Sequence, residues 1–510
     1  MGVPPAIQAA AECLPENHYN ALRFAAASDS KRIQMAVNGW DLARKGFPYH
    51  RLLRYVSLMP DNLEEYPDTS ASQTLSEAEL RAHWMPFTGN RQFKRQPRLF
   101  SSAEGVYYTT VDGRKVFDGL SGLWTCGLGH CRKEISEAVS RQVASLDYSP
   151  GFQYGHPLSF KLAHKLVELT PDGLDQVFFT DSGSETIDTA LKMSRGYWRN
   201  KGLPGKTKFI GRIKGYHGVN YGGIGVGGIG FNRKLFGQAV DADHIPHTVL
   251  PENTFSKGLP DAGAHLADEL EELVLLHDAS NIAAVVVEPM SGTAGVLPPP
   301  KGYLRRLREI CDAHNLLLIF DEVITGLGRM GAYTGAEEFG VTPDILTLAK
   351  QITNGAQPLG AVVSKQEIYD TYMDQGGPDY MVEFPHGYTY SAHPVACAAG
   401  LAALDVLERE QLPQRVKAMS GYFEQVVHQL KGAPYVEDIR NYGFAAGISL
   451  QHHPGEPLRR PFELGLKCFE KGFYVRWGGD TVQLAPAFVV NEKQIDSLIN
   501  GVGEALHEFP

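Results

Sequence analysis

The sequence predicts an α/β protein in which a large, mostly parallel sheet is joined by a smaller α+β domain and a helical N-terminal extension. Short, almost wholly apolar runs such as residues 282–287 and 316–320 have the length of strands buried on both faces. Amphipathic helix patterns such as residues 303–314 alternate with these runs, as they do around a doubly covered sheet. The 510 residues, of which 43% are apolar and 21% charged, allow about two to four ordinary globular domains.

The expected elements follow in chain order. Residues 1–78 contain helix-compatible stretches but no convincing strand, and we treat them as the extension. Residues 79–125 begin the small domain with a hairpin around Asp112-Gly113, residues 126–393 form the large domain, and residues 394–510 complete the small domain. Strands are expected at 176–180, 208–212, 282–287, 316–320, 345–348, 361–364, 444–450, 473–477 and 481–484. Helices are expected at 185–198, 265–276, 303–314, 395–408, 414–430 and 492–506.

Composition argues against several classes of protein. The formal net charge of −10 disfavours a nucleic-acid binder, which needs a basic face. No apolar run approaches the ~18 residues of a membrane span, and the first residues lack the basic start of a signal peptide. Six scattered cysteines without a C-x-x-C pair indicate reduced thiols and a cytoplasmic location. The 18 histidines show no metal-ligand spacing, so we expect no metal site.

One glycine-rich run resembles a nucleotide-binding motif. Residues from Gly223 to Gly228 match G-x-G-x-x-G, the pattern of a dinucleotide-binding turn. Such a turn should follow a strand and open a helix, and residues 216–230 predict neither of these. We therefore expect a flexible, closely packed loop here.

Four features lie where predicted strands end, which is the edge at which open α/β sheets bind ligands. Ser182-Gly-Ser-Glu185 joins a strand to a helix and offers free N–H groups to a phosphate. Asp321 follows a very apolar strand, where a carboxylate needs a cation or a hydrogen-bond donor. Lys350 follows another strand, and a partly buried lysine has the lowered pKa of a Schiff-base nucleophile. Tyr216 lies between glycines and offers an aromatic plate.

Each feature also has an ordinary structural explanation. The serine can cap a helix, the carboxylate can bond a loop, the lysine can be solvated and the tyrosine can pack in the core. Together, however, the four provide a phosphate anchor, an aromatic stack, a carboxylate for a pyridinium nitrogen and a lysine amine. That combination, in this order along alternating strands, is typical of pyridoxal-phosphate chemistry.

Longer motifs cover most of the chain. They are Trp84-Met-Pro-Phe87-Thr88, Gly122-Leu-Trp124, Ser182-Gly-Ser-Glu185, Gly215-Tyr-His-Gly218, Val286-Val-Glu288-Pro289, Pro299-Pro-Lys-Gly-Tyr303, Phe320-Asp-Glu-Val-Ile324, Ala349-Lys350, Thr353-Asn-Gly355, His386-Gly-Tyr-Thr389-Tyr-Ser391, His393-Pro394 and Tyr474-Val-Arg476-Trp-Gly-Gly479-Asp480. With these motifs the chain resembles class III aminotransferases from about residue 80 to its end. More narrowly, it resembles the omega-amino acid:pyruvate (β-alanine:pyruvate) transaminase subgroup.

The resemblance implies the aspartate-aminotransferase-type fold (PLP fold type I), with pyridoxal 5′-phosphate as cofactor. It also implies a homodimer, or an oligomer built from dimers, with active sites at the subunit interface. Lys350 would hold the cofactor as an internal aldimine and then move the substrate proton. Asp321 would keep the pyridine nitrogen protonated, so that the ring becomes a better electron sink. The other cofactor contacts implied are Val323 and Tyr216 on the two ring faces, and Gly183, Ser184 and Thr389 of the partner subunit at the phosphate.

The implied reaction is a ping-pong transfer of an amino group from an omega-amino acid or primary amine to pyruvate or another oxo acid. Arg476 would pair with a substrate carboxylate and swing aside for an uncharged amine, while Trp124 and Phe87 would shape the substrate pocket. Asp181 and Gln351 depart from the family pattern near the phosphate and the lysine. Two alternatives remain: an aminomutase or decarboxylase on the same fold, and a catalytically silent pyridoxal-phosphate-binding protein.

Overall fold

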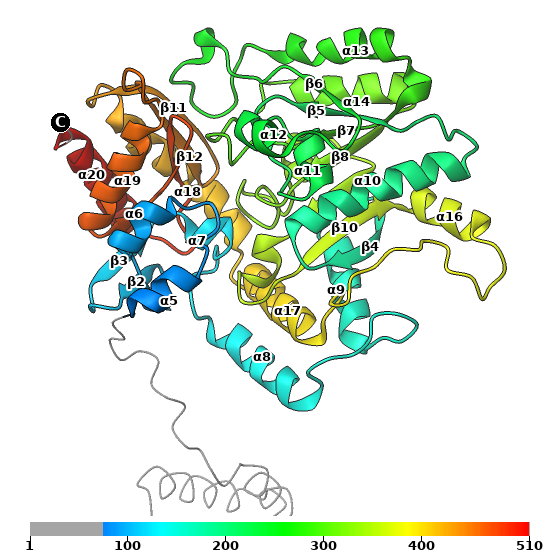
Figure 1. The fold of residues 1–510 in the computed structure, drawn as a ribbon, viewed down its shortest axis with the longest axis horizontal. Coiled ribbons are helices and arrows are strands. Elements are labelled where there is room, and N and C mark those ends of the chain that lie inside the picture. The colour runs from blue at the N-terminus through cyan, green and yellow to red at the C-terminus, as the bar shows by residue number, and fades with distance from the viewer. Residues whose placement is uncertain (1–74, 509–510) are drawn as a thin grey trace, which may run out of the picture. The chain divides into compact units, whose positions relative to one another are not determined.

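A seven-stranded sheet lies at the centre of the computed structural model, which describes residues 75–508 of the chain (Figure 1). Its strands run in the order β4-β10-β9-β8-β7-β5-β6. Their bounds are β4 Leu174–Thr180, β5 Lys208–Arg212, β6 Ala242–Ile245, β7 Ile282–Val287, β8 Leu317–Asp321, β9 Ile345–Leu348 and β10 Gly360–Lys365. The sequence predicted six of these strands to within about two residues at either end. It missed β6, a short strand of mixed polarity at the edge of the sheet.

The sheet is mostly parallel, as the sequence predicts. Strand β10 is the exception, because it pairs antiparallel with both β4 and β9, whereas the other pairs are parallel. The composition of a strand specifies burial but carries no direction, so this reversal could not be predicted. Its consequence is that the start of β10 lies at the same edge as the carboxyl ends of the other strands.

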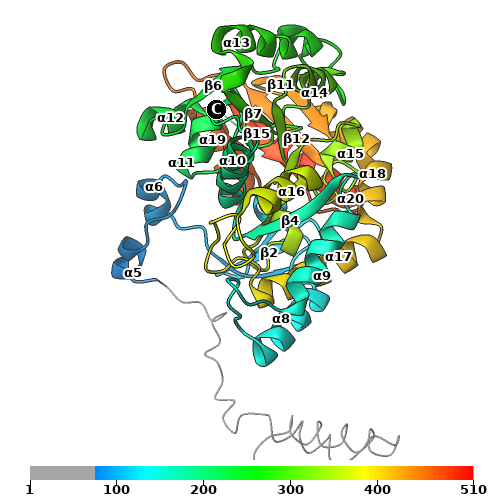
Figure 2. The ribbon, with the colours of Figure 1, turned by 90° about the vertical axis from the view of Figure 1, so that its right-hand side faces the viewer.

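Two apolar cores cover the two faces of this sheet. Alternate residues of each strand point to opposite faces, so Phe320 joins one core while its neighbour Ile319 joins the other. Helices α10 (Gly183–Asn200) and α16 (Gln366–Gln375) contribute to the core of Ile319. Helices on the opposite face, α9 (Pro157–Glu168), α13 (Glu269–His277), α14 (Tyr303–Ala313) and α17 (Pro394–Arg409), contribute to the core of Phe320 (Figure 2). This two-sided burial is why the central strands β7, β8 and β9 are almost wholly apolar.

Two four-stranded sheets accompany the large one. The first contains β1 (Phe100–Glu104), β2 (Tyr107–Thr110), β3 (Lys115–Asp118) and β13 (Phe473–Tyr474). The second contains β11 (Val436–Tyr442), β12 (Ala445–Leu450), β15 (Thr481–Leu484) and β14 (Arg476–Gly478). Strands β2 and β3 pair antiparallel, which confirms the predicted hairpin.

The single strand predicted at 473–477 is wrong. The chain changes sheets at the buried Val475: β13 pairs parallel with β3, and β14 pairs antiparallel with β15. An unbroken apolar and aromatic run hides this change, because both halves look like one strand. The change matters because it sets the position of Arg476 at the start of β14.

The remaining helices surround these sheets. They are α5 (Glu77–Ala82), α6 (Asn90–Arg95), α7 (Ser121–Trp124), α8 (Lys133–Ser145), α11 (Tyr221–Val226), α12 (Gly230–Phe236), α15 (Gly335–Phe339), α18 (Leu412–Val427), α19 (Arg459–Glu470) and α20 (Glu492–His507). Among the described helices, none has the length and apolarity needed to cross a membrane. The predicted extension at 1–78 lies outside the described residues except for 75–78, where α5 begins. The domain boundaries at 125/126 and 393/394 stay predictions.

The glycine-rich segment is not the loop that the sequence predicts. It contains the short helix α11, whose glycines are buried. A Cβ on Gly223 would lie 2.1 Å from the carbonyl oxygen of His217, so only glycine fits. Close packing was predicted correctly, and the helix was missed because glycine is a poor helix former.

Candidate active site

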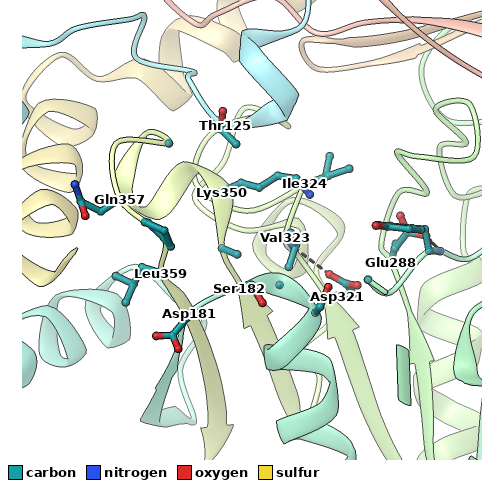
Figure 3. A pocket seen from close by; sticks show the side chains of 17 residues that line it. Thr125, Asp181, Ser182, Glu288, Asp321, Val323, Ile324, Lys350, Gln357 and Leu359 are labelled. Atoms are coloured by element: carbon teal, nitrogen blue, oxygen red, sulfur yellow. Dashed lines mark hydrogen bonds between the residues drawn. The ribbon is translucent and has the colours of Figure 1, made fainter. Parts of the chain in front are cut away.

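A pocket of about 320 Å³ lies at the edge where the strands of the large sheet end (Figure 3). Segments that follow β4, β5, β7, β8 and β9 line it, together with the residues just before β10. The lining includes the predicted site residues Gly183, Ser184, Tyr216, Asp321, Val323 and Lys350. The fold therefore brings together groups that are up to 167 positions apart in the sequence, since 350 − 183 = 167.

Asp321 is a buried acceptor at the end of β8. His217 Nδ1 lies 2.8 Å from its Oδ2, and the backbone N–H of Val323 donates to its Oδ1 at 3.2 Å. The next residue, Glu322, points away from the pocket and accepts backbone N–H bonds from Gly335 and Ala336 at the start of α15. Because neighbouring side chains at a strand end point in opposite directions, Asp321 faces the pocket and Glu322 faces the start of α15.

Lys350 reaches across the pocket from the end of β9 (Figure 3). Burial lowers the pKa of its amine to about 8, with Arg476 also lowering it and Asp321 opposing both. The amine is therefore unprotonated far more often at neutral pH than that of a solvated lysine, which favours its action as a nucleophile. Its backbone φ of +48° lies in the left-handed region, and such strain collects at functional sites.

The start of α10, directly after β4, forms a cradle of backbone N–H groups. Gly183 and Ser184 are the first residues of this 18-residue helix, whose N-cap is Ser182, so their N–H groups point out of the helix start. A Cβ on Gly183 would lie 2.9 Å from Val323 Cγ1, and one on Gly218 would lie 2.5 Å from Ser184 Oγ. These two glycines let Val323 and the segment after Tyr216 close directly onto the helix start.

Glu288 holds the aromatic plate in place. Its Oε1 accepts a hydrogen bond from the backbone N–H of Tyr216 at 2.9 Å and another from Ser291 Oγ at 2.9 Å. Its Oε2 accepts the N–H of Gly292 at 3.1 Å. Burial raises the pKa of Glu288 in spite of the nearby cation of Arg212. The site thus contains a second buried carboxylate beside Asp321.

Asp181 and Gln351, the two residues that depart from the family pattern, each have defined contacts. Asp181 lines the pocket with its carboxylate turned away from Lys350, and burial and the charge of Glu185 raise its pKa to about 6 (Figure 3). Its backbone N–H donates to Glu185 at 2.7 Å, and Ser182, not Asp181, caps the helix. Gln351 is buried, and its Oε1 accepts a hydrogen bond from the backbone N–H of Gly127 at 2.8 Å. This bond joins the turn that contains Lys350 to the loop that follows α7.

Four predicted residues do not line this pocket in the described chain. Trp124 is buried in an apolar cluster with Ile324, which does line the pocket. Phe87 is 73% exposed, and Thr389 is exposed with its carbonyl accepting a bond from Tyr148 Oη. Arg476 is close enough to Lys350 and Tyr216 to shift their pKa values. The roles of all four stay predictions.

Glu288 and His217 lie in the sequence motifs, but the sequence predicts no role for either residue. The signal for Glu288 was available, because it follows an apolar strand just as Asp321 does. The role of His217 depends on a contact across 104 positions, which no local pattern shows. Thr125, Ile324 and the segment 357–359 were also missed, since they are ordinary residues that the fold places at the pocket. No cluster of three potential metal ligands occurs in the described residues.

Fold and site together define an aminotransferase. The chain belongs to the class-III aminotransferases, whose family pattern matches residues 88–506. It is 60% identical over 442 residues to the beta-alanine–pyruvate aminotransferase of Pseudomonas aeruginosa, covering 86% of this chain and 99% of that protein. It is 58% identical over 445 residues to the omega-amino acid–pyruvate aminotransferase of Pseudomonas putida, covering 87% and 99%.

Solved structures agree in fold. An (S)-enantioselective omega-transaminase from Thermomicrobium roseum has a TM-score of 0.79 and 35% identity, over 85% of this chain and 99% of that one. An amine transaminase from an uncultivated Pseudomonas species, solved with PLP bound, has a TM-score of 0.77 and 34% identity, over 83% and 98%. The described fold is therefore the aspartate-aminotransferase type that the resemblance implied.

Proposed function

We propose that this protein transfers an amino group from an omega-amino acid or a primary amine to pyruvate. The observation that carries the proposal is the pocket in which Lys350, with a pKa near 8, shares one cavity with Asp321 and the helix start at Gly183. The 58–60% identical relatives named as pyruvate aminotransferases support the choice of acceptor.

The residues of the pocket fit pyridoxal 5′-phosphate. Gly183 and Ser184 would hold the phosphate, Tyr216 and Val323 the two faces of the ring, and Asp321 the ring nitrogen. Bound there, the cofactor supplies an electron sink for the bond that breaks at the substrate's amine-bearing carbon. The cradle is closed by Gly218, where a Cβ would collide with Ser184, so the chain is shaped around this helix start.

The chain's own groups then divide the work. Lys350 Nζ would hold the cofactor and, when freed, would accept and return the substrate proton as a general base and acid. Asp321, hydrogen-bonded to His217, would lie against the ring nitrogen and favour its protonated form. The guanidinium of Arg476 can meet a substrate carboxylate with two parallel hydrogen bonds. Trp124 and Phe87 would limit the size of the substrate.

The test is alanine formation. Purified protein with pyruvate and β-alanine, or pyruvate and 1-phenylethylamine, should yield alanine, and the Lys350→Ala variant should lose about a hundredfold to ten-thousandfold in kcat. No alanine from a broad panel of amines would exclude transamination to pyruvate. Release of carbon dioxide instead would indicate a decarboxylase.

We further propose a homodimer in which Thr389 completes the partner's phosphate site. Thr389 is exposed on its own chain and does not line its own pocket. Exposed aromatic side chains elsewhere in the described chain suit a subunit interface; they include Trp84, Phe87, Phe152, Tyr154 and Tyr390. We also place the enzyme in the cytoplasm, which suits the free thiols of its five described cysteines.

Mixed dimers test the shared site. The Lys350→Ala and Thr389→Glu variants should each be nearly inactive alone. Co-expressed, they should regain activity, because one of the two sites in a mixed dimer then contains both Lys350 and Thr389. No recovery, in a sample shown to contain mixed dimers, contradicts a Thr389 contributed by the partner.

A further inference from the structure

Gln483 carries a buried acceptor that has no partner. It lies in β15 with no exposed surface, and its Nε2 donates to the carbonyl oxygen of Thr293 at 2.8 Å. Its Oε1 is buried without a hydrogen bond in the described part of the chain. Buried polar atoms are nearly always hydrogen-bonded, so an exception calls for an explanation.

The orientation of this amide is determined by its surroundings. Turning the side chain over would place Oε1 against the Thr293 carbonyl, and two acceptors cannot bond each other. The nitrogen therefore faces Thr293 and the oxygen faces elsewhere. What the site lacks is a donor that can approach Oε1.

Arg476 is such a donor. It pairs directly with Gln483 across the antiparallel strands β14 and β15, so both side chains lie on one face with Cβ atoms about 4.5–5.5 Å apart. Gly478, two residues further on, lies on the same face, and even a Cβ there would stand 3.7 Å from Gln483 Nε2. Gly478 therefore places no side chain of its own against the amide of Gln483.

The guanidinium of Arg476 lies near enough to Lys350 and Tyr216 for its charge to act on both, although Arg476 does not itself line the pocket. Its positive charge helps to lower the pKa of Lys350. It also opposes the rise that burial causes in the pKa of Tyr216. Within the described residues it has no hydrogen bond or ion pair. A guanidinium has five N–H donors and stays charged, so wherever it lies it needs acceptors. In the pocket a substrate carboxylate supplies them; outside the pocket, Oε1 of Gln483 is free.

We propose that Gln483 is a specificity-determining residue, whose Oε1 accepts a hydrogen bond from Arg476 when the guanidinium withdraws from the pocket for an amine without a carboxylate. This inference rests on the proposed function, because it requires a site that takes amines with and without a carboxylate. A carboxylate-bearing donor keeps Arg476 in the pocket and leaves Gln483 unbonded. A donor without a carboxylate requires the guanidinium of Arg476 to leave the pocket. The hydrogen bond to Gln483 Oε1 lowers the free energy of that withdrawn position.

The experiment measures the amine half-reaction of the holoenzyme with two donors, racemic 1-phenylethylamine and L-alanine, for wild type and Gln483→Leu. We expect kcat/KM for 1-phenylethylamine to fall by about tenfold to a hundredfold, the strength of a hydrogen bond to a charged group. The value for L-alanine should stay unchanged. Thr481→Val is the matched control, since it alters the same buried strand and face without reaching Arg476, and it should affect neither donor selectively.

A double-mutant cycle shows whether the effect acts through Arg476. In an Arg476→Ala background no guanidinium needs an acceptor, so Gln483→Leu should no longer lower the rate with 1-phenylethylamine. Equal losses for both donors, no loss with 1-phenylethylamine, or a loss that persists in the Arg476→Ala background each overturns the assignment. A wild-type enzyme that converts neither donor contradicts the proposed function itself, and the inference with it.

Discussion

Replacing Gly218 by alanine tests how the proposed phosphate cradle at the start of α10 is built. Gly218 has a φ of +87°, and a Cβ there would lie 2.5 Å from Ser184 Oγ and 2.6 Å from Ser184 Cα. Because the Cα belongs to the first turn of α10, no change of rotamer relieves the collision and the helix start itself must move. The left-handed backbone costs about 1–2 kcal/mol and the overpacking about 1–3 kcal/mol, so we expect the free energy of unfolding to fall by about 2–5 kcal/mol.

Gly202 provides the matched control. Its φ of +78° is nearly the same, but a Cβ there meets no atom within 4 Å. Gly202→Ala should therefore lose only the backbone part, about 1–2 kcal/mol. The difference between the two variants isolates the collision with Ser184.

Two assays read the result. Denaturant unfolding gives the stability of each variant, and equilibrium dialysis with pyridoxamine 5′-phosphate, which forms no bond to Lys350, gives the affinity of the cradle. Gly218→Ala should bind this ligand more weakly, whereas Gly202→Ala should bind it as the wild type does. If Gly218→Ala matches Gly202→Ala in both assays, the contact between Gly218 and Ser184 does not shape the cradle.

Three further predictions concern titration, substrate charge and the second carboxylate. Since burial lowers the pKa of Lys350 to about 8, the rate at which the apoenzyme takes up pyridoxal phosphate should rise about tenfold per pH unit below that value and level off above it. In Asp321→Asn the midpoint should move to lower pH, because this carboxylate raises the pKa of Lys350; an unchanged midpoint contradicts the assignment. Arg476→Ala should lower kcat/KM for pyruvate by about tenfold to a hundredfold, while the half-reaction with 1-phenylethylamine is spared; equal losses in steady-state assays refute the pairing. Glu288→Gln turns an NH2 group toward N–H and O–H donors, and thermal or denaturant unfolding should show a loss of about 1–3 kcal/mol; no loss means that the bonds to Tyr216 and Gly292 are replaceable.

Much of the site could be predicted because its reactive side chains directly follow strands of the large sheet. The apolar run before Asp321 and the one before Lys350 identify buried strands, and in a parallel sheet their carboxyl ends must meet at one edge. Glu288 obeys the same rule and could have been predicted in the same way. His217 could not, because its bond to Asp321 joins two different strand ends and depends on side-chain direction.

The sequence by itself determined most strands and helices of the large sheet, since burial on both faces demands apolar runs and one-sided burial demands a helical period. It also predicted that Lys350, Asp321 and the turn at Ser182–Glu185 lie at one edge of the sheet, where residues of all three line one pocket. Only the tertiary structure decided that β10 runs against its neighbours and that the chain changes sheets at Val475. These are decisions about direction and pairing, and pairing is made between residues far apart in the chain. For the same physical reason the facing pair of Arg476 and Gln483, seven positions apart but on two strands, is visible only in the folded molecule.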